Sequence, residues 1–154
     1  PAFYLPSILA SSNDIDTFRK TGQRRDLNRE KFEANKLLEI LKNFDSSASK
    51  NISYLSHIIK VRARLHAFHP EAYMKCISTS IPHCVIIQRG LDEDQLYVIC
   101  NLSDKYLDVS LFNEVDLLKS TSKKRLIDNI TGSYLKGDTF KLNPYQVVWV
   151  SFTE

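Results

Sequence analysis

The chain has 154 residues, of which 43% are hydrophobic and 25% charged, as is typical of a folded globular protein. Its net charge of +3 is too small to predict nucleic-acid binding, which requires a clustered basic face. No apolar run approaches the roughly 20 residues that a membrane-spanning helix needs. We therefore expect neither a nucleic acid nor a membrane as partner.

Cys76, Cys84 and Cys100 are an odd number of cysteines without metal-ligand spacing, which argues against a disulfide framework. They favour a reducing compartment, and we expect a cytoplasmic protein. The four histidines lack the paired spacing of a zinc-binding helix. We expect structural roles for them, and neither a metal nor a cofactor.

The chain opens at Pro1, without Met or a signal peptide, and runs at once into the apolar segment 2–5. This segment is typical of a buried strand. Because a native chain seldom begins inside its own core, the opening predicts a piece of a longer protein.

A polar stretch follows from Ser11 to Glu30 and is too long for a tight turn. Loops of this length in compact proteins are usually functional. Within it, Asn13 and Asp14 either line a pocket or cap a short helix that starts near Ile15. Both interpretations stay open at this point, with the cap favoured.

Two helices are predicted next. Apolar residues recur at helical spacing over about Ala34 to Asn43. A clearer stripe follows Ser49, which offers a hydroxyl cap. This second helix should end before Pro70, which disfavours helical geometry at the residue before it.

From about Tyr73 the pattern becomes that of strands. Segments 84–88, 96–102 and 146–152 are rich in Val, Ile and aromatic residues, and alternation recurs at 107–111 and 140–142. The second half is therefore predicted to be a small antiparallel β-domain, without helical interruption, whose sheet packs through one face.

Two features of this half have a structural and a functional interpretation. Trp149 and Tyr145 could form a sugar-stacking platform, but a Trp within the run VVWV is more typical of a core. The basic cluster Lys119, Lys123, Lys124 and Arg125 is typical of a solvated loop or strand edge.

Several segments, in their order along the chain, carry a resemblance to a known family. They are PAFYLPSILASSND, TGQRRDLNRE, VRARLHAFHP, LYVICNLS and PYQVVWVSF. Together they resemble the end of the catalytic barrel and the following β-domain of glycoside hydrolase family thirteen, the α-amylase superfamily. The RDLNR run preceded by TG resembles the sucrose phosphorylase subgroup.

The resemblance implies an α+β fragment in which residues 1–71 form the C-terminal portion of a (β/α)8 TIM barrel. They would supply its last strand, an acceptor-side loop and two helices, and residues 72–154 would form the all-β domain. The opening strand would then find its neighbours in the missing N-terminal part of the barrel. Residues 11–30 would face the sugar, because barrel active sites lie at the C-terminal ends of the strands.

The resemblance also implies a retaining reaction that uses an Asp nucleophile, a Glu acid/base and a further Asp. None of these positions falls within this chain, which is expected to be inactive alone. Substrates would be sucrose, phosphorylated sucrose or glucosylglycerate, with the glucosyl group passing to inorganic phosphate or to water.

Arg25 matches the Arg that opens the RDINR-type motif near the acceptor, and its planar fork suits a phosphate, a carboxylate or vicinal hydroxyls. Asp26 and Arg29 either contact substrate or orient Arg25, and the cluster could instead be an internal salt-bridge network. Arg24 stands where sucrose phosphorylases tend to have a small residue, which favours an anionic acceptor.

The alternative function is a stand-alone, non-catalytic carbohydrate-binding or interaction module. The behaviour of the isolated chain separates the two hypotheses. A module should unfold cooperatively as a monomer, whereas a barrel fragment should aggregate, pair with another chain or leave its first 70 residues mobile.

Overall fold

A computed structural model of the chain describes residues 3–115, 125–137 and 139–153. The chain divides into two compact units, residues 1–60 and residues 61–154. The predicted domains 1–71 and 72–154 differ from these units in their boundary and stay a prediction.

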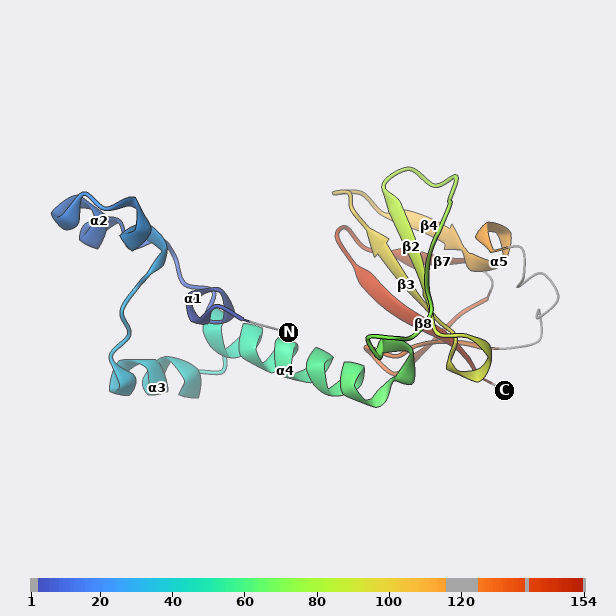
Figure 1. Ribbon diagram of the computed structural model, residues 1–154, viewed down its shortest axis with the longest axis horizontal. Coiled ribbons are helices and arrows are strands. Elements are labelled where there is room, and N and C mark those ends of the chain that lie inside the picture. The colour runs from blue at the N-terminus through green and yellow to red at the C-terminus, as the bar shows by residue number, and fades with distance from the viewer. Residues whose placement is uncertain (1–2, 116–124, 138, 154) are drawn as a thin grey trace. The chain divides into compact units, whose positions relative to one another are not determined.

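The first unit is helical. In chain order its elements are α1 (Leu5–Ile8), α2 (Ile15–Thr21), the 3-10 helix η1 (Arg24–Asn28), α3 (Ala34–Lys42) and the start of α4 (Ser47–Arg64) (Figure 1). Helices α3 and α4 confirm the two predicted helices. The cap of α4 is Ser46 rather than Ser49, because the Ser46 hydroxyl accepts a hydrogen bond of 3.1 Å from the Ser49 backbone N–H.

The predicted opening strand is wrong where the structure describes it. Tyr4 is extended, but Leu5 begins α1, and Pro6 lies in the first turn, where its missing N–H costs no hydrogen bond. Phe3, Tyr4 and Leu5 are each about half exposed. None of the described residues 3–60 forms a strand, so this segment has no ladder to join. The end of a (β/α)8 barrel stays a prediction.

The second unit is built on antiparallel strands, as predicted. They are β1 (Met74–Ile77), β2 (Cys84–Arg89), β3 (Leu96–Asn101), β4 (Leu107–Ser110), β5 (Arg125–Asp128), β6 (Ser133–Leu135), β7 (Thr139–Leu142) and β8 (Val147–Thr153). Six strands form a sheet in the order β1-β2-β3-β8-β5-β6, and β4 pairs with β7 in a second, two-stranded sheet. The expected hairpin joins β2 to β3 in the register Ile86↔Ile99.

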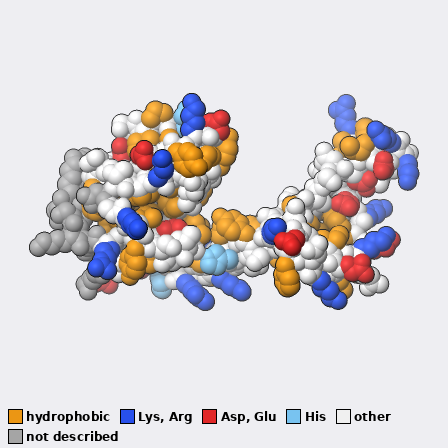
Figure 2. Space-filling view, turned by 180° about the vertical axis from the view of Figure 1, so that it is seen from behind, with side chains coloured by type: hydrophobic (Ala, Val, Ile, Leu, Met, Phe, Trp, Pro, Cys, Tyr) orange, Lys and Arg blue, Asp and Glu red, His pale blue; other side chains and the backbone are white. Residues whose placement is uncertain are grey.

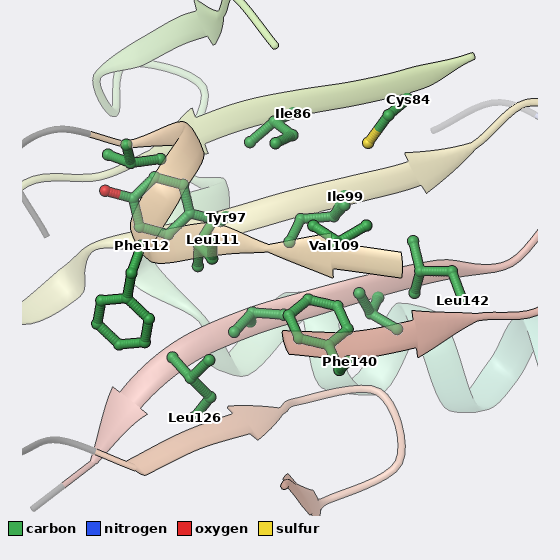
Figure 3. Close-up of a cluster of buried hydrophobic side chains, with 13 residues drawn as sticks. Cys84, Ile86, Tyr97, Ile99, Val109, Leu111, Phe112, Leu126, Phe140 and Leu142 are labelled. Carbon is green, nitrogen blue, oxygen red and sulfur yellow. The ribbon is translucent and has the colours of Figure 1, made fainter. Parts of the chain in front are cut away.

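The core of this unit lies between the two sheets. Alternate residues of β2, such as Cys84 and Ile86, are buried, and Val109 and Phe140 from the smaller sheet join the same cluster. Figure 3 shows these side chains converging from both sheets. This packing of inward-facing side chains confirms the prediction of a β-domain with a one-sided core.

Short helices interrupt the β-domain, contrary to the sequence-based expectation. Leu111 was expected on a strand but begins α5 (Leu111–Glu114), where it is fully buried. A 3-10 turn, η3 (Asp92–Asp94), lies between β2 and β3. In the basic cluster, residues 119–124 lie outside the described residues, and Arg125 begins β5.

Trp149 is part of the core, as predicted. It is 8% exposed, and its ring centroid lies 4.5 Å from that of Phe68 in the 3-10 helix η2 (His66–Phe68). Arg89 holds η2 in place, because its Nε donates to the Ala67 carbonyl oxygen at 2.9 Å and its Nη2 to that of His69 at 2.8 Å. Residues 66–69 are thereby attached to the six-stranded sheet.

Candidate functional site

The polar stretch 11–30 is more ordered than a loop, because α2 and η1 lie within it. Asp14 caps α2: its carboxylate accepts hydrogen bonds from the Thr17 backbone N–H at 2.9 Å and the Thr17 hydroxyl at 2.6 Å. These two bonds hold the pKa of the Asp14 carboxyl below its usual value. The cap interpretation of Asp14 is therefore confirmed, and a contact with substrate stays a prediction.

Helix α2 ends at Thr21, and the next residue, Gly22, is its C-cap with a left-handed φ of +67°. The chain then turns into η1, which carries the RDLN part of the motif. The short turn brings the two helical segments against each other. Asp26 of η1 accepts a hydrogen bond of 2.7 Å from the hydroxyl of Thr21, the last residue of α2.

Three arginines border one open hollow of about 580 Å³. Its lining residues are Tyr4, Arg24, Arg25, Asn28 and Arg29. The Tyr4 hydroxyl donates a hydrogen bond of 2.9 Å to the Asn28 carbonyl oxygen, which fixes the opening segment beside η1. All five side chains belong to the first unit.

Asp26 does not line the arginine hollow, although it lies near Arg25. Its Oδ1 lies 4.0 Å from Arg25 Nε, at the outer limit of an ion pair. The Asp26 side chain is 22% exposed, whereas that of Arg25 is 65% exposed. Such a long, solvated pair contributes little, so the guanidinium of Arg25 keeps its donors available to a ligand.

Asn13 and Asp14 border a second hollow, of about 500 Å³. Its other lining residues are Ser12, Ile15, Asp16, Arg19, Glu30 and Lys31. The structure thus brings Arg25 together with Arg29, and Asn13 together with Asp14, but the two pairs line different hollows.

The arginine hollow is suited to binding and not to cleavage. Three guanidinium groups offer forked donors to a phosphate or a carboxylate. None of the residues that line it carries a carboxylate, the group that retaining cleavage of a glycosidic bond requires in a pair. Among the described residues, no group of His, Cys, Asp or Glu is placed to hold a metal ion.

Two lining residues were not predicted for this site. Asn28 lies inside the RDLNR run, so the motif itself was the available signal. Tyr4 was assigned to the buried strand, and its contact with Asn28 spans 24 residues, which local patterns do not reveal.

Figure 2 shows many Lys and Arg side chains standing out from the molecular surface.

The chain is similar to three curated proteins named glucosylglycerate phosphorylase. It is 29% identical to that of Allomeiothermus silvanus over 97% of this chain, 26% to that of Escherichia coli over 97%, and 22% to that of Spirochaeta thermophila over 98%. It spans only 24%, 25% and 27% of their respective lengths. No protein-family model matches the chain.

The chain resembles a C-terminal part of these glucosylglycerate phosphorylases. This confirms the resemblance noted in the sequence. The share of about a quarter means that most of the relatives' residues have no counterpart here.

Solved structures support the same fold. An α-amylase from Anoxybacillus superposes with a TM-score of 0.55 over 71% of this chain and 24% of its own, at 15% identity. AmyP, solved in complex with maltotriose, gives 0.53 over 70% of this chain and 22% of its own, at 18% identity. At these identities the likeness concerns the fold alone, a small sheet-rich α+β domain like those that end α-amylases.

No helix among the described residues is both long and apolar enough to cross a membrane.

Proposed function

We propose that this chain is the C-terminal part of a glycoside phosphorylase that cleaves an α-glucoside of the glucosylglycerate type by retaining glucosyl transfer. Inorganic phosphate attacks the glucosyl–enzyme intermediate, and the products are glucose 1-phosphate and the released acceptor. Sucrose and phosphorylated sucrose are the other candidate substrates, and hydrolysis is the competing outcome when water attacks instead.

One observation supports this proposal most directly. Nearly the whole chain matches about a quarter of glucosylglycerate phosphorylases from three different organisms. A shared independent module would be expected to match proteins of varied activity, whereas these three relatives carry one name.

The packing of residues 1–60 supports a larger parent domain. Among the described residues 3–60, only Leu9 and Ala48 are buried. Large apolar side chains are exposed instead, including Phe44 at 84% and Leu38 at 55%. A unit of this size with so small a core cannot offset its conformational entropy, so it requires a partner surface. In our proposal that partner is the N-terminal part of the same enzyme, which also supplies the catalytic Asp, Glu and Asp.

The arginine hollow gives this unit its role in the reaction. Arg25 is proposed to hold the acceptor side of the substrate, with Arg29 as a second donor and Asp26 as a positioning residue. Arg24 adds a third positive charge at the same hollow, which favours an anionic acceptor such as glycerate. Asn13 and Asp14 are proposed to border the substrate from the second hollow, with Asp14 also capping α2.

A chimera tests the proposal. Residues 1–154 replace the matching quarter of the Escherichia coli relative, and glucose 1-phosphate is measured with glucosylglycerate and phosphate as substrates. We expect phosphorolysis by the chimera and none by the 154-residue chain alone. Product formation by the isolated chain would contradict the placement of the catalytic carboxylates elsewhere. A folded chimera that releases no glucose 1-phosphate would contradict the proposed function.

A further inference from the structure

Strand β1 lies at one end of the six-stranded sheet and pairs only with β2. Just before it, the Gly90 backbone N–H donates to the Tyr73 carbonyl oxygen at 2.9 Å. Backbone groups alternate in direction along an antiparallel strand, so those of Met74 and Cys76 point to the open edge. Nothing in the described part of the chain hydrogen-bonds to this edge. β1 can therefore accept one further strand.

A hollow of about 440 Å³ borders the same strand. Its lining includes Lys75 and Ile77 of β1, Gln88 of β2, and Glu114 and Val115 at the end of α5. All of these residues belong to the second unit. Lys75 and Ile77 are paired with Gln88 and Ile86, so they share the face of the sheet that carries Gln88. This cavity is called the edge hollow below.

The polar side chains of the edge hollow keep free hydrogen-bonding capacity. Gln88 is 4% exposed, yet no described group hydrogen-bonds to its side-chain amide, an arrangement that costs stability. A carboxylate can accept about four hydrogen bonds, and Glu114 receives two of 3.1 Å from Ser80. Among residues 3–115, 125–137 and 139–153, no ion pair involves Glu114 or Lys75.

The edge hollow suits a primary ammonium on an aliphatic stem. The stem would lie on Ile77 and Val115, and the ammonium would donate to Gln88 Oε1 and the Glu114 carboxylate. Lysine is the side chain with this chemistry. A lysine on a strand added to β1 would use the open backbone edge and the hollow together.

We propose that β1 pairs with β1 of a second copy of this chain, with the two Cys76 residues opposite each other. In this antiparallel, two-fold register, Lys75 of each copy lies opposite Ile77 of the other, on the face that carries Gln88. Each copy thus places its unpaired Lys75 in the edge hollow of the other, beside Glu114. The charges are complementary across the two-fold axis. Because the paired strands are short, the dimer is weak, and it does not depend on the proposed reaction.

Analytical ultracentrifugation of the full 154-residue chain, from low to high micromolar concentration, tests the pairing. We expect a reversible monomer–dimer equilibrium. Lys75→Gln removes the ammonium and should raise the dissociation constant of the dimer about tenfold or more. The matched control is Lys105→Gln, an exposed lysine between β3 and β4, which should leave the constant unchanged. A lysine on an edge strand can instead keep other strands away, so tighter association of Lys75→Gln would overturn the proposal, as would a chain that stays monomeric.

An exchange of charges identifies the second copy as the occupant. Lys75→Glu and Glu114→Lys should each abolish self-association, because like charges then meet. An equimolar mixture of the two variants should form a heterodimer, in which both contacts join opposite charges. Failure of two folded variants to associate when mixed would contradict the pairing.

Cross-linking tests the register without the Glu114 variant, which also loses its bonds to Ser80. Directly opposite residues of this kind lie about 5.5 Å apart between Cα atoms, within the range of a disulfide. Oxidation with diamide should therefore join wild-type copies through the exposed Cys76, and Cys76→Ser should stay unlinked. Dimers that form without this link and persist in Lys75→Glu would place the contact elsewhere and remove the β1 interface. The chimera assay of phosphorolysis is decided separately from each of these results.

Discussion

The hydroxyl of Tyr4 donates a hydrogen bond of 2.9 Å to the carbonyl oxygen of Asn28, and both residues border the hollow that carries Arg25. Tyr4, which was predicted to lie in a buried strand, thus lines the candidate site instead. Because the contact joins residues 24 positions apart, it positions the opening segment and the arginine motif together.

Replacing Arg25 tests the forked contact directly. In the chimera, Arg25→Lys keeps the positive charge but loses the planar pair of donors. We expect kcat/KM for phosphorolysis to fall roughly 10- to 100-fold, the loss expected for hydrogen bonds to a charged group. The matched control is Arg64→Lys, an exposed residue at the end of α4, which should leave kcat/KM unchanged. An unchanged value for Arg25→Lys would remove this residue from the site.

The cap of α2 should depend on pH. The folded-state pKa of Asp14 lies below its ordinary value of 3.8 because of the hydrogen bonds from Thr17. The stabilisation is therefore complete above about pH 4 and is lost as the pH falls through the lowered folded-state value. Hydrogen exchange of the Thr17 amide should accelerate, relative to unstructured amides, as the pH drops in this range. Asp14→Asn, which caps without titrating, should show no such change.

Asn101 is expected to be a major contributor to the stability of the β-domain. Asn101→Ala removes four hydrogen bonds and leaves the Lys105 and Asn143 carbonyl oxygens without this donor. We predict a loss of about 2–4 kcal/mol in the free energy of unfolding, measured from the urea midpoint. Asn35→Ala, at an exposed position of α3, should change it by less than about 0.5 kcal/mol. Equal effects would contradict the role of Asn101.

For Tyr97 we predict the opposite effect of a substitution on stability. Its side chain is fully buried, and its hydroxyl has no hydrogen-bond partner among the described residues. Tyr97→Phe removes this unpaired group and should leave stability unchanged or raise it by about 1 kcal/mol. Destabilisation by more than this amount would show that the hydroxyl is bonded.

The same burial raises the pKa of Tyr97 to about 12. Tyr97 therefore ionises more readily in the unfolded chain than in the folded one. This difference has no effect on stability below about pH 10, and it lowers the free energy of unfolding as the pH rises toward 12. The wild-type chain should therefore lose more stability than Tyr97→Phe over this alkaline range.

Local sequence patterns were sufficient for the long elements. Helical periodicity located α3 and α4, and β-branched runs located β2, β3 and β8. These signals are strong because one face of each element is apolar over several residues. The same logic placed Trp149 in the core, where Phe68 packs against it.

The short elements were missed or misassigned for physical reasons. Segment 2–5 is apolar enough for a strand, but Pro6 favours a helix start and residues 3–60 offer no sheet to pair with. β5 and β6 are brief, and β6 lies at the edge of the sheet. The pairing that places β5 in the sheet is with β8, and this contact is long-range information that local patterns do not carry. The site shows the same limit, since the motif indicated Arg25 but not Tyr4.

Hydrogen exchange of the whole 154-residue chain tests the central claim most directly, namely that residues 1–60 need the rest of an enzyme for their stability. We predict that slow-exchanging amides are confined to the strands of residues 61–154, where the core lies, and that the amides of α1 to α3 exchange quickly. Equally strong protection in both units of the monomeric chain would show that residues 1–60 are self-sufficient. That result would contradict the assignment of the chain to a larger catalytic domain.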